Sequence, residues 1–275
     1  MKSGVNQWSF PSSLVISNVL QLAAEAGFAG IELTVGSLGS TGLHMETTSA
    51  QARAIGKQAR GLQLEVPSLA TDLLWESPLS SPNSAVRERA RGIVLKQLEL
   101  AAALEVGTIL VVPGNVTRDC GYAECYRRSG EELSALAVRA QELGVRIGIE
   151  NVWNKFLLSP LEMAAFIDGC HSPAIGAYFD VGNILLYGYP EDWINTLGRR
   201  IISVHVKDFL VSVGNLQGFV PLFSGDVQWS SVRAALVASE YDGYLTAEVS
   251  RPNEGQGRFL AEMARSVNAI ANGFL

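Results

Sequence analysis

Residues 175–180 read IGAYFD, an almost wholly apolar run that ends in an aspartate. Seven other short β-like segments lie along the chain, and a longer helical stretch separates each from the next. The eight segments span residues 5–9, 30–33, 63–67, 108–112, 146–150, 175–180, 201–206 and 244–249. Several are nearly all apolar, as expected for strands that are buried on both faces of a parallel sheet.

Helical spacing and capping signals fill the intervals between these segments. Apolar residues recur every three or four positions in 85–105 and 131–143, and Gly144 is a plausible C-cap for the second helix. Ser159 and Pro160 predict the start of another helix. Eight βα units without a linker favour a closed (β/α)₈ TIM barrel, an α/β fold, over a doubly wound sheet. We therefore expect one barrel domain over 1–275.

The composition narrows the possible classes of partner. The net charge is −6, which provides no basic field to attract nucleic acid or an anionic membrane. The three cysteines, Cys120, Cys125 and Cys170, match no zinc ribbon or redox pair and are expected to be reduced. No signal peptide and no run of ~20 apolar residues is visible, so we expect a cytoplasmic protein.

Four potential metal ligands end four consecutive predicted strands: Glu150, Asp180, His205 and Glu248. The C-terminal ends of barrel strands form one catalytic mouth, so these side chains should converge. Each residue taken alone is more often structural than catalytic. Together they would bury unpaired carboxylates at high cost, which a divalent cation would offset. The mostly oxygen ligand set favours Mn²⁺, Mg²⁺ or Co²⁺, and Zn²⁺ is also compatible.

Six motifs, in this order and spacing, resemble those of the sugar phosphate isomerase/epimerase family. The motifs are GIEL (30–33), IENVWN (149–154), FDVGN (179–183), SVHVKD (203–208), GDVQW (225–229) and GYLTAEV (243–249). This family lies within the xylose-isomerase-like barrel superfamily, which includes ketose 3-epimerases, hydroxypyruvate isomerases, inosose dehydratases and endonuclease IV. The resemblance covers essentially the whole chain.

The resemblance implies that Glu150, Asp180, His205 and Glu248 hold one divalent metal ion, with Mn²⁺ the first choice. It further implies that Glu150 and Glu248 act as acid/base catalysts on opposite faces of a ketose or ketose phosphate. Abstraction of a proton α to a carbonyl leaves an enediolate, whose charge a metal can stabilise. Return of the proton on the other face gives epimerisation, whereas its transfer between neighbouring carbons gives isomerisation.

Seven residues are candidate substrate contacts: Trp8, Glu32, Trp75, Lys155, Asn183, Lys207 and Arg251. The tryptophans would form walls for a sugar or pack at the rim, and Glu32 would orient a hydroxyl or a histidine or form a salt bridge. Asn183 occupies a position that is histidine in some epimerases. Asparagine can hydrogen-bond a hydroxyl but cannot carry charge, so this chain departs from the tagatose/psicose epimerase type. Lys155 and Arg251 are candidates for a phosphate, although solvated loop charges are the default interpretation.

Three other functions compete with an isomerase. An inosose-type dehydratase would use the same metal and expel a β-hydroxyl, and a non-catalytic barrel would only bind sugar. A nuclease of the endonuclease IV type is disfavoured, because the chain has three histidines and an acidic charge. The carbohydrate, its phosphorylation, and the choice between a homodimer and a homotetramer stay open.

Overall fold

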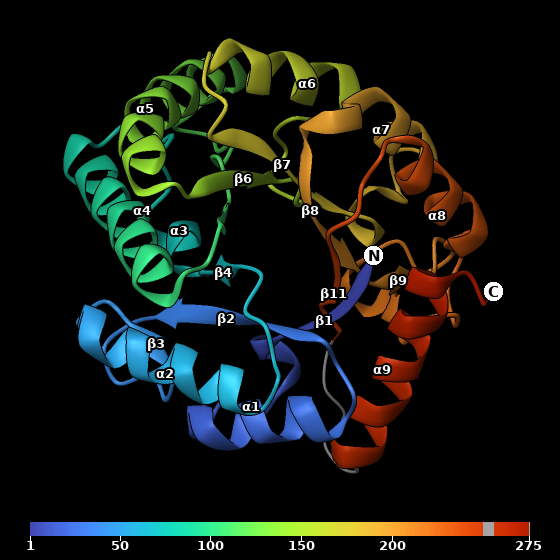
Figure 1. The fold of residues 1–275 in the computed structure, drawn as a ribbon. Helices are drawn as coiled ribbons and strands as arrows, with labels where there is room; N and C mark the ends of the chain where they lie inside the picture. Colours follow the sequence, from blue (N-terminus) through green and yellow to red (C-terminus); the bar gives the residue numbers. More distant parts are fainter. Residues whose placement is uncertain (250–255, 275) are drawn as a thin grey trace.

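The computed structural model describes residues 1–249 and 256–274, and its centre is a closed barrel of eight parallel strands (Figure 1). The barrel strands are β1 (Lys2–Asn6), β2 (Gly30–Gly36), β4 (Leu69–Ala70), β5 (Thr108–Val111), β6 (Arg146–Glu150), β7 (Ile175–Asp180), β8 (Ile201–Val206) and β11 (Tyr244–Ala247). Strand β1 pairs in parallel with both β2 and β11, and these two ladders close the sheet. The predicted TIM barrel is confirmed.

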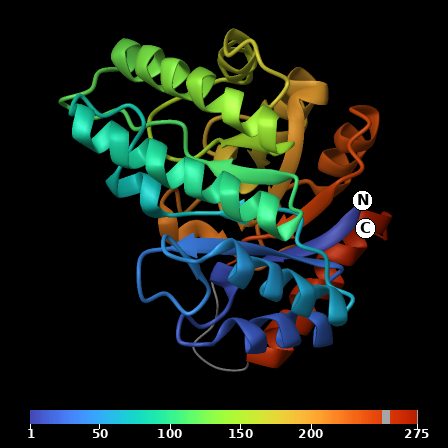
Figure 2. The same ribbon diagram turned by 60° about the vertical axis from the view of Figure 1, so that its left-hand side comes forward.

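Helices form a ring around this barrel (Figures 1 and 2). They are α1 (Ile16–Glu25), α2 (Ser49–Gly61), α3 (Leu73–Glu76), α4 (Ser84–Leu104), α5 (Tyr122–Leu143), α6 (Pro160–Gly169), α7 (Pro190–Leu197), α8 (Trp229–Ala238) and α9 (Gln256–Asn272). Outside the barrel, β3 (Leu43–His44) pairs in parallel with the end of β2, and β9 (Asp208–Phe209) pairs antiparallel with β10 (Phe219–Val220). No helix among the described residues is long and apolar enough to cross a membrane.

The capping predictions are confirmed. The Ser159 side chain accepts a hydrogen bond from the Glu162 backbone N–H, and Pro160 occupies the first turn of α6. Gly144 adopts a left-handed conformation with φ of 65° at the end of α5, and its N–H donates to the Ala140 carbonyl. These signals fix where two of the outer helices begin and end.

Two predicted strands are misplaced. The segment 63–67 is not a strand: Gln63 has a φ of 57°, Pro67 lacks an N–H, and only an isolated bridge joins Glu65 to Gly30. The third barrel strand is β4, two residues beyond the proline. The first strand lies at Lys2–Asn6 rather than 5–9, because residues 7–9 form a 3₁₀ turn.

Other helices and strands differ from their predicted bounds by fewer residues or at one end only. The helix predicted at 131–143 begins at Tyr122, and the helix predicted at 85–105 spans Ser84–Leu104. The last barrel strand ends at Ala247 rather than at residue 249, so Glu248 lies just beyond it. All three cysteines are free and buried.

Candidate metal centre

The predicted ligands Glu150, Asp180, His205 and Glu248 come together at the C-terminal mouth of the barrel. Each offers one ligand atom, and these atoms lie within 4.8 Å of one another. Asp180 and His205 pair across β7 and β8, and both are fully buried. Glu150 is also buried, whereas the Glu248 side chain is 23% exposed. The strand register thus brings residues up to 98 positions apart into one cluster.

His205 presents its two ring nitrogens to different groups. Nδ1 lies 3.3 Å from Glu150 Oε1, 3.5 Å from Glu248 Oε2 and 3.8 Å from Asp180 Oδ2. Nε2 lies 2.7 Å from Glu32 Oε1 on the opposite side of the ring. A hydrogen bond from Nε2–H to Glu32 leaves the lone pair of Nδ1 for a ligand at the cluster.

Glu32 is fully buried and accepts several hydrogen bonds besides that from His205. Its Oε1 accepts from Asn6 Nδ2 at 2.5 Å, and its Oε2 accepts from Ser68 Oγ at 2.7 Å and Tyr178 OH at 2.5 Å. Burial acts to raise the pKa of Glu32, but attraction to His205 and the hydrogen bonds from His205, Tyr178 and Ser68 lower it below its ordinary value. Glu32 thus lies as the hydrogen-bond partner of His205, the geometry that one of its three expected roles requires, and it does not line the cavity described below.

The three supporting residues Asn6, Ser68 and Tyr178 were missed in the sequence. Tyr178 had a readable signal: it lies two residues before Asp180 on β7, so both side chains project from the same face of the strand. Asn6 and Ser68 gave no such signal, because the strand predicted at 5–9 ends at Asn6 and the third barrel strand begins after Ser68.

Lys207 joins the cluster as an internal cation. Its Nζ lies 2.5 Å from Glu248 Oε2 and 3.1 Å from Asp180 Oδ2. Burial raises the pKa of Glu150 to about 7. Burial also acts to raise the pKa of Glu248, but attraction to Lys207 and His205 lowers it below its ordinary value. The two glutamates therefore differ in proton affinity.

The donor set fits a divalent cation. Three carboxylates and one imidazole nitrogen are ligands that such ions accept in proteins. Asp180 Oδ2 is buried and receives no hydrogen bond from any described residue, despite the nearby ammonium of Lys207. A buried carboxylate oxygen without a hydrogen-bond partner needs another source of positive charge, and a bound cation would supply it.

A cavity of about 410 Å³ opens above the cluster. Glu150 and Glu248 line it, together with Trp8, Trp75, Asn183 and Lys207, whereas Asp180 and His205 lie beneath its wall. This volume is within the range of small-molecule sites. Two of the four predicted ligands thus also face the space that a substrate would occupy.

The remaining predicted contacts differ in where they lie. Asn183 borders the cavity, but its backbone N–H donates to Asp180 Oδ1 and its side-chain amide to the Asn151 carbonyl, so it also braces the cluster. Lys155 is exposed and does not line the cavity. Arg251 lies outside the described residues. Trp153, from the same loop after β6 as Lys155, lines the cavity, and its Nε1–H donates to the Asn183 carbonyl.

A parallel eight-stranded barrel with a carboxylate–histidine cluster at its strand ends defines the class: TIM-barrel proteins with a potential divalent-metal site. Within it, residues 20–268 match the family model described as xylose isomerase-like TIM barrel. The chain belongs to this family. None of the curated protein sequences matches it significantly.

Solved structures of sugar epimerases share this fold. An L-ribulose 3-epimerase matches with a TM-score of 0.82 and 18% identity, over 99% of this chain and 95% of its own. A D-psicose 3-epimerase determined in the presence of D-fructose gives 0.79 and 19%, over 99% and 98%. The D-psicose 3-epimerase from Clostridium cellulolyticum H10, determined with D-tagatose, gives 0.81 and 16%, over 99% of both chains.

Proposed function

We propose that this protein is a metal-dependent isomerase or epimerase of a ketose that acts by moving a proton next to the carbonyl. One observation carries the proposal: of the four clustered ligands, only Glu150 and Glu248 also line the cavity. They come from β6 and from the end of β11, and β7 and β8 separate these strands in the sheet. Two carboxylates can therefore approach a bound sugar from different sides.

The chain's own groups divide the chemistry between them. Glu150, with a pKa raised to about 7 by burial, is suited to take a proton near neutral pH. Glu248, held by Lys207, is placed to exchange a proton at the other side of the substrate. Asp180 and His205 fix the site from beneath. A divalent ion, when bound, would stabilise the negative charge that develops on the substrate oxygens.

The fold relatives support the choice of substrate class. The solved structures described above act on ketoses according to their descriptions: an L-ribulose 3-epimerase and D-psicose 3-epimerases. At 16–19% identity they share the fold with this chain, so we propose a ketose as the substrate class and name no particular sugar. Manganese is the ion we would test first, followed by Mg²⁺, Co²⁺ and Zn²⁺.

A lyase on the same site is the second candidate, and Lys207 favours it. Its ammonium lines the cavity beside Glu248, so a proton donor lies next to a base, although attraction to Asp180 and Glu248 outweighs burial and raises the pKa of Lys207. Elimination of a β-hydroxyl needs such an acid to protonate the leaving oxygen. The product of this elimination has the mass of the substrate minus one water, whereas the product of epimerisation has the same mass as the substrate, so mass spectrometry distinguishes the two reactions.

The decisive experiment follows exchange of a substrate proton in D₂O. We would incubate the metal-loaded protein with C4–C6 ketoses, with and without a terminal phosphate, and record deuterium incorporation. Glu150→Gln and Glu248→Gln should each abolish exchange, whereas Glu65→Gln, an exposed glutamate, should retain it. Exchange that survives both cavity substitutions would contradict the two-carboxylate mechanism. Elemental analysis that finds no divalent ion, with activity resistant to a chelator, would contradict the metal site.

A further inference from the structure

A second hollow lies beside the cavity, with a volume of about 1000 Å³. We call it the β2 groove. Its walls come from the segment after β1, from the end of β2 with the loop toward β3, and from α3 after β4. Trp8 and Trp75 line both the β2 groove and the cavity, so the two hollows adjoin at the tryptophans. The groove more than doubles the space next to the candidate metal centre.

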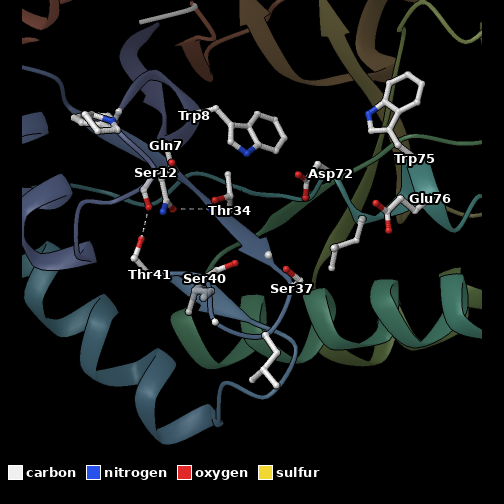
Figure 3. A pocket seen from close by; sticks show the side chains of 18 residues that line it. Gln7, Trp8, Ser12, Thr34, Ser37, Ser40, Thr41, Asp72, Trp75 and Glu76 are labelled. Atoms are coloured by element: carbon white, nitrogen blue, oxygen red, sulfur yellow. Dashed lines mark hydrogen bonds between the residues drawn. The ribbon is translucent and has the colours of Figure 1, made fainter. Parts of the chain in front are cut away.

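The walls of the β2 groove are held in place by hydrogen bonds between its segments (Figure 3). The Thr34 backbone N–H donates to Gln7 Oε1 at 2.9 Å, and Thr41 Oγ1 donates to the Ser12 carbonyl at 3.1 Å. These contacts tie the loop after β2 to the segment that follows β1. Two of the three wall segments are therefore joined by direct hydrogen bonds.

Polar side chains on these walls keep free hydrogen-bonding capacity. Figure 3 shows Asp72 between Trp8 and Trp75, with Ser37 across the groove. Within the described part of the chain, the side chains of Ser37, Asp72 and Glu76 form no hydrogen bond or ion pair. A serine hydroxyl can donate to or accept from the hydroxyl groups of a sugar, and a carboxylate accepts hydrogen bonds from them.

The two tryptophans provide apolar surface at the junction. Trp8 is 36% exposed and Trp75 is 43% exposed, so both indole rings present apolar surface at this junction. Exposed indole faces bind the C–H face of a sugar ring, whose other edge carries the hydroxyls. An aromatic wall next to free polar groups is therefore suited to a carbohydrate ring.

The charge of the groove argues against a phosphate. Its charged lining residues are Asp72 and Glu76, and no lysine or arginine lines it among the described residues. In the cavity, the cationic lining residue of the described chain is Lys207, which is already bound to Asp180 and Glu248. Two carboxylates would repel a phosphate group and would accept hydrogen bonds from neutral hydroxyls.

We propose that the substrate is a disaccharide-sized ketose: the ketose unit lies at the metal centre, and a second, neutral sugar ring lies in the β2 groove against Trp8 and Trp75. This proposal rests on the proposed function for the identity of the reacting unit. It adds that the far end of the substrate carries a glycosyl group rather than a phosphate.

Binding measurements on the metal-loaded full chain test this proposal without relying on turnover. We would compare the Kd of D-fructose with those of three glucosyl-fructoses linked through O4, O5 or O6, which leave the first three carbons unchanged. At least one should bind tenfold or more tightly than D-fructose. Saturation-transfer NMR should show contact of its glucosyl protons with the protein.

Substitutions in the groove should remove this difference. Ser37→Trp fills the groove from an exposed position and should bring the ratio of the two Kd values close to one. Asp72→Ala should lower the ratio at least threefold. Asp119→Ala, an exposed aspartate outside both hollows, is the matched control and should keep the ratio of the unsubstituted protein.

The outcomes separate this proposal from the proposed function. If none of the three disaccharides binds more tightly than D-fructose, or if Ser37→Trp keeps the gain, the second sugar site is wrong. Proton exchange with free ketoses would then still support an isomerase. If no ketose exchanges a proton but the affinity ratio behaves as expected, the groove is upheld and the proposed reaction fails.

Discussion

Replacing Glu32 by glutamine should weaken metal binding although Glu32 is not itself a ligand in the cluster. Glutamine keeps the size of the side chain and one acceptor oxygen. That oxygen can retain the bonds from Asn6 and His205, while its NH₂ group turns toward Ser68 and Tyr178, whose hydroxyls can accept instead. One hydroxyl hydrogen can then bridge Ser68 and Tyr178, which lie 3.0 Å apart, while the other loses its acceptor. The substitution thus removes the charge and one hydroxyl hydrogen bond while keeping the shape of the side chain.

The size of the effect follows from the bonds that lose charge assistance. A hydrogen bond to a charged group contributes about 1.5–3 kcal/mol and a neutral one about 0.5–1.5 kcal/mol, so each retained bond weakens by about 1 kcal/mol. Two such bonds give about 2 kcal/mol. This agrees with the 10–100-fold loss of metal affinity that is typical when the partner of a ligating histidine is changed.

Calorimetric titration of the metal-free variant with Mn²⁺ at pH 8 would measure this loss. Glu65→Gln, whose exposed carboxylate pairs with Lys2 away from the cluster, is the matched control and should bind like the unsubstituted protein. An affinity of Glu32→Gln within twofold of the unsubstituted value would refute the assignment of Glu32 as the group that orients His205.

Two further outcomes follow from the same site. Burial raises the pKa of Glu150 from 4.5 to about 7, which favours its protonated form in the metal-free fold. The stability that this protonated carboxyl contributes is therefore fully present below pH 4.5 and is lost as the pH rises to 7. Metal binding needs the carboxylate, so the Kd for Mn²⁺ should be at least tenfold weaker at pH 6 than at pH 8, and a flat profile would contradict this. In Gly182→Ala, the new Cβ would lie 2.6 Å from Lys207 Cγ and 2.7 Å from its carbonyl oxygen, so we expect a loss of about 1–3 kcal/mol in unfolding free energy. Thermal unfolding would measure it, with Gly169→Ala, which has open space, as the control that should not show this loss.

The parts of this molecule that were predictable depend on short-range patterns. The apolar runs that end in Glu150 and Asp180 predicted both the strands and the residues at their C-terminal ends, which lie at the mouth of the barrel. The segment 63–67 shows the limit of this approach. Its alternation resembles a strand, but the left-handed Gln63 and the proline prevent regular pairing.

The support of His205 by Glu32 could not be fully read from the sequence. The two residues are 173 positions apart, and the other partners of Glu32 lie on or near β1, β4 and β7. Only barrel closure brings them together. The β2 groove was also unpredicted, because its three wall segments are loops and a short helix whose relative placement depends on tertiary contacts.

Strand β1 has a consequence for the order of events on the ribosome. It pairs with β11, so the first barrel strand waits for residues 244–247 to be synthesised before its second ladder can form. The same delay applies to the metal, because Glu248 follows directly after β11. A nascent chain that has reached α8 carries three of the four ligands in an open sheet. If the proposed site holds a divalent ion, that ion would gain its fourth ligand only late in biosynthesis, so it would stabilise the closed barrel rather than start its folding.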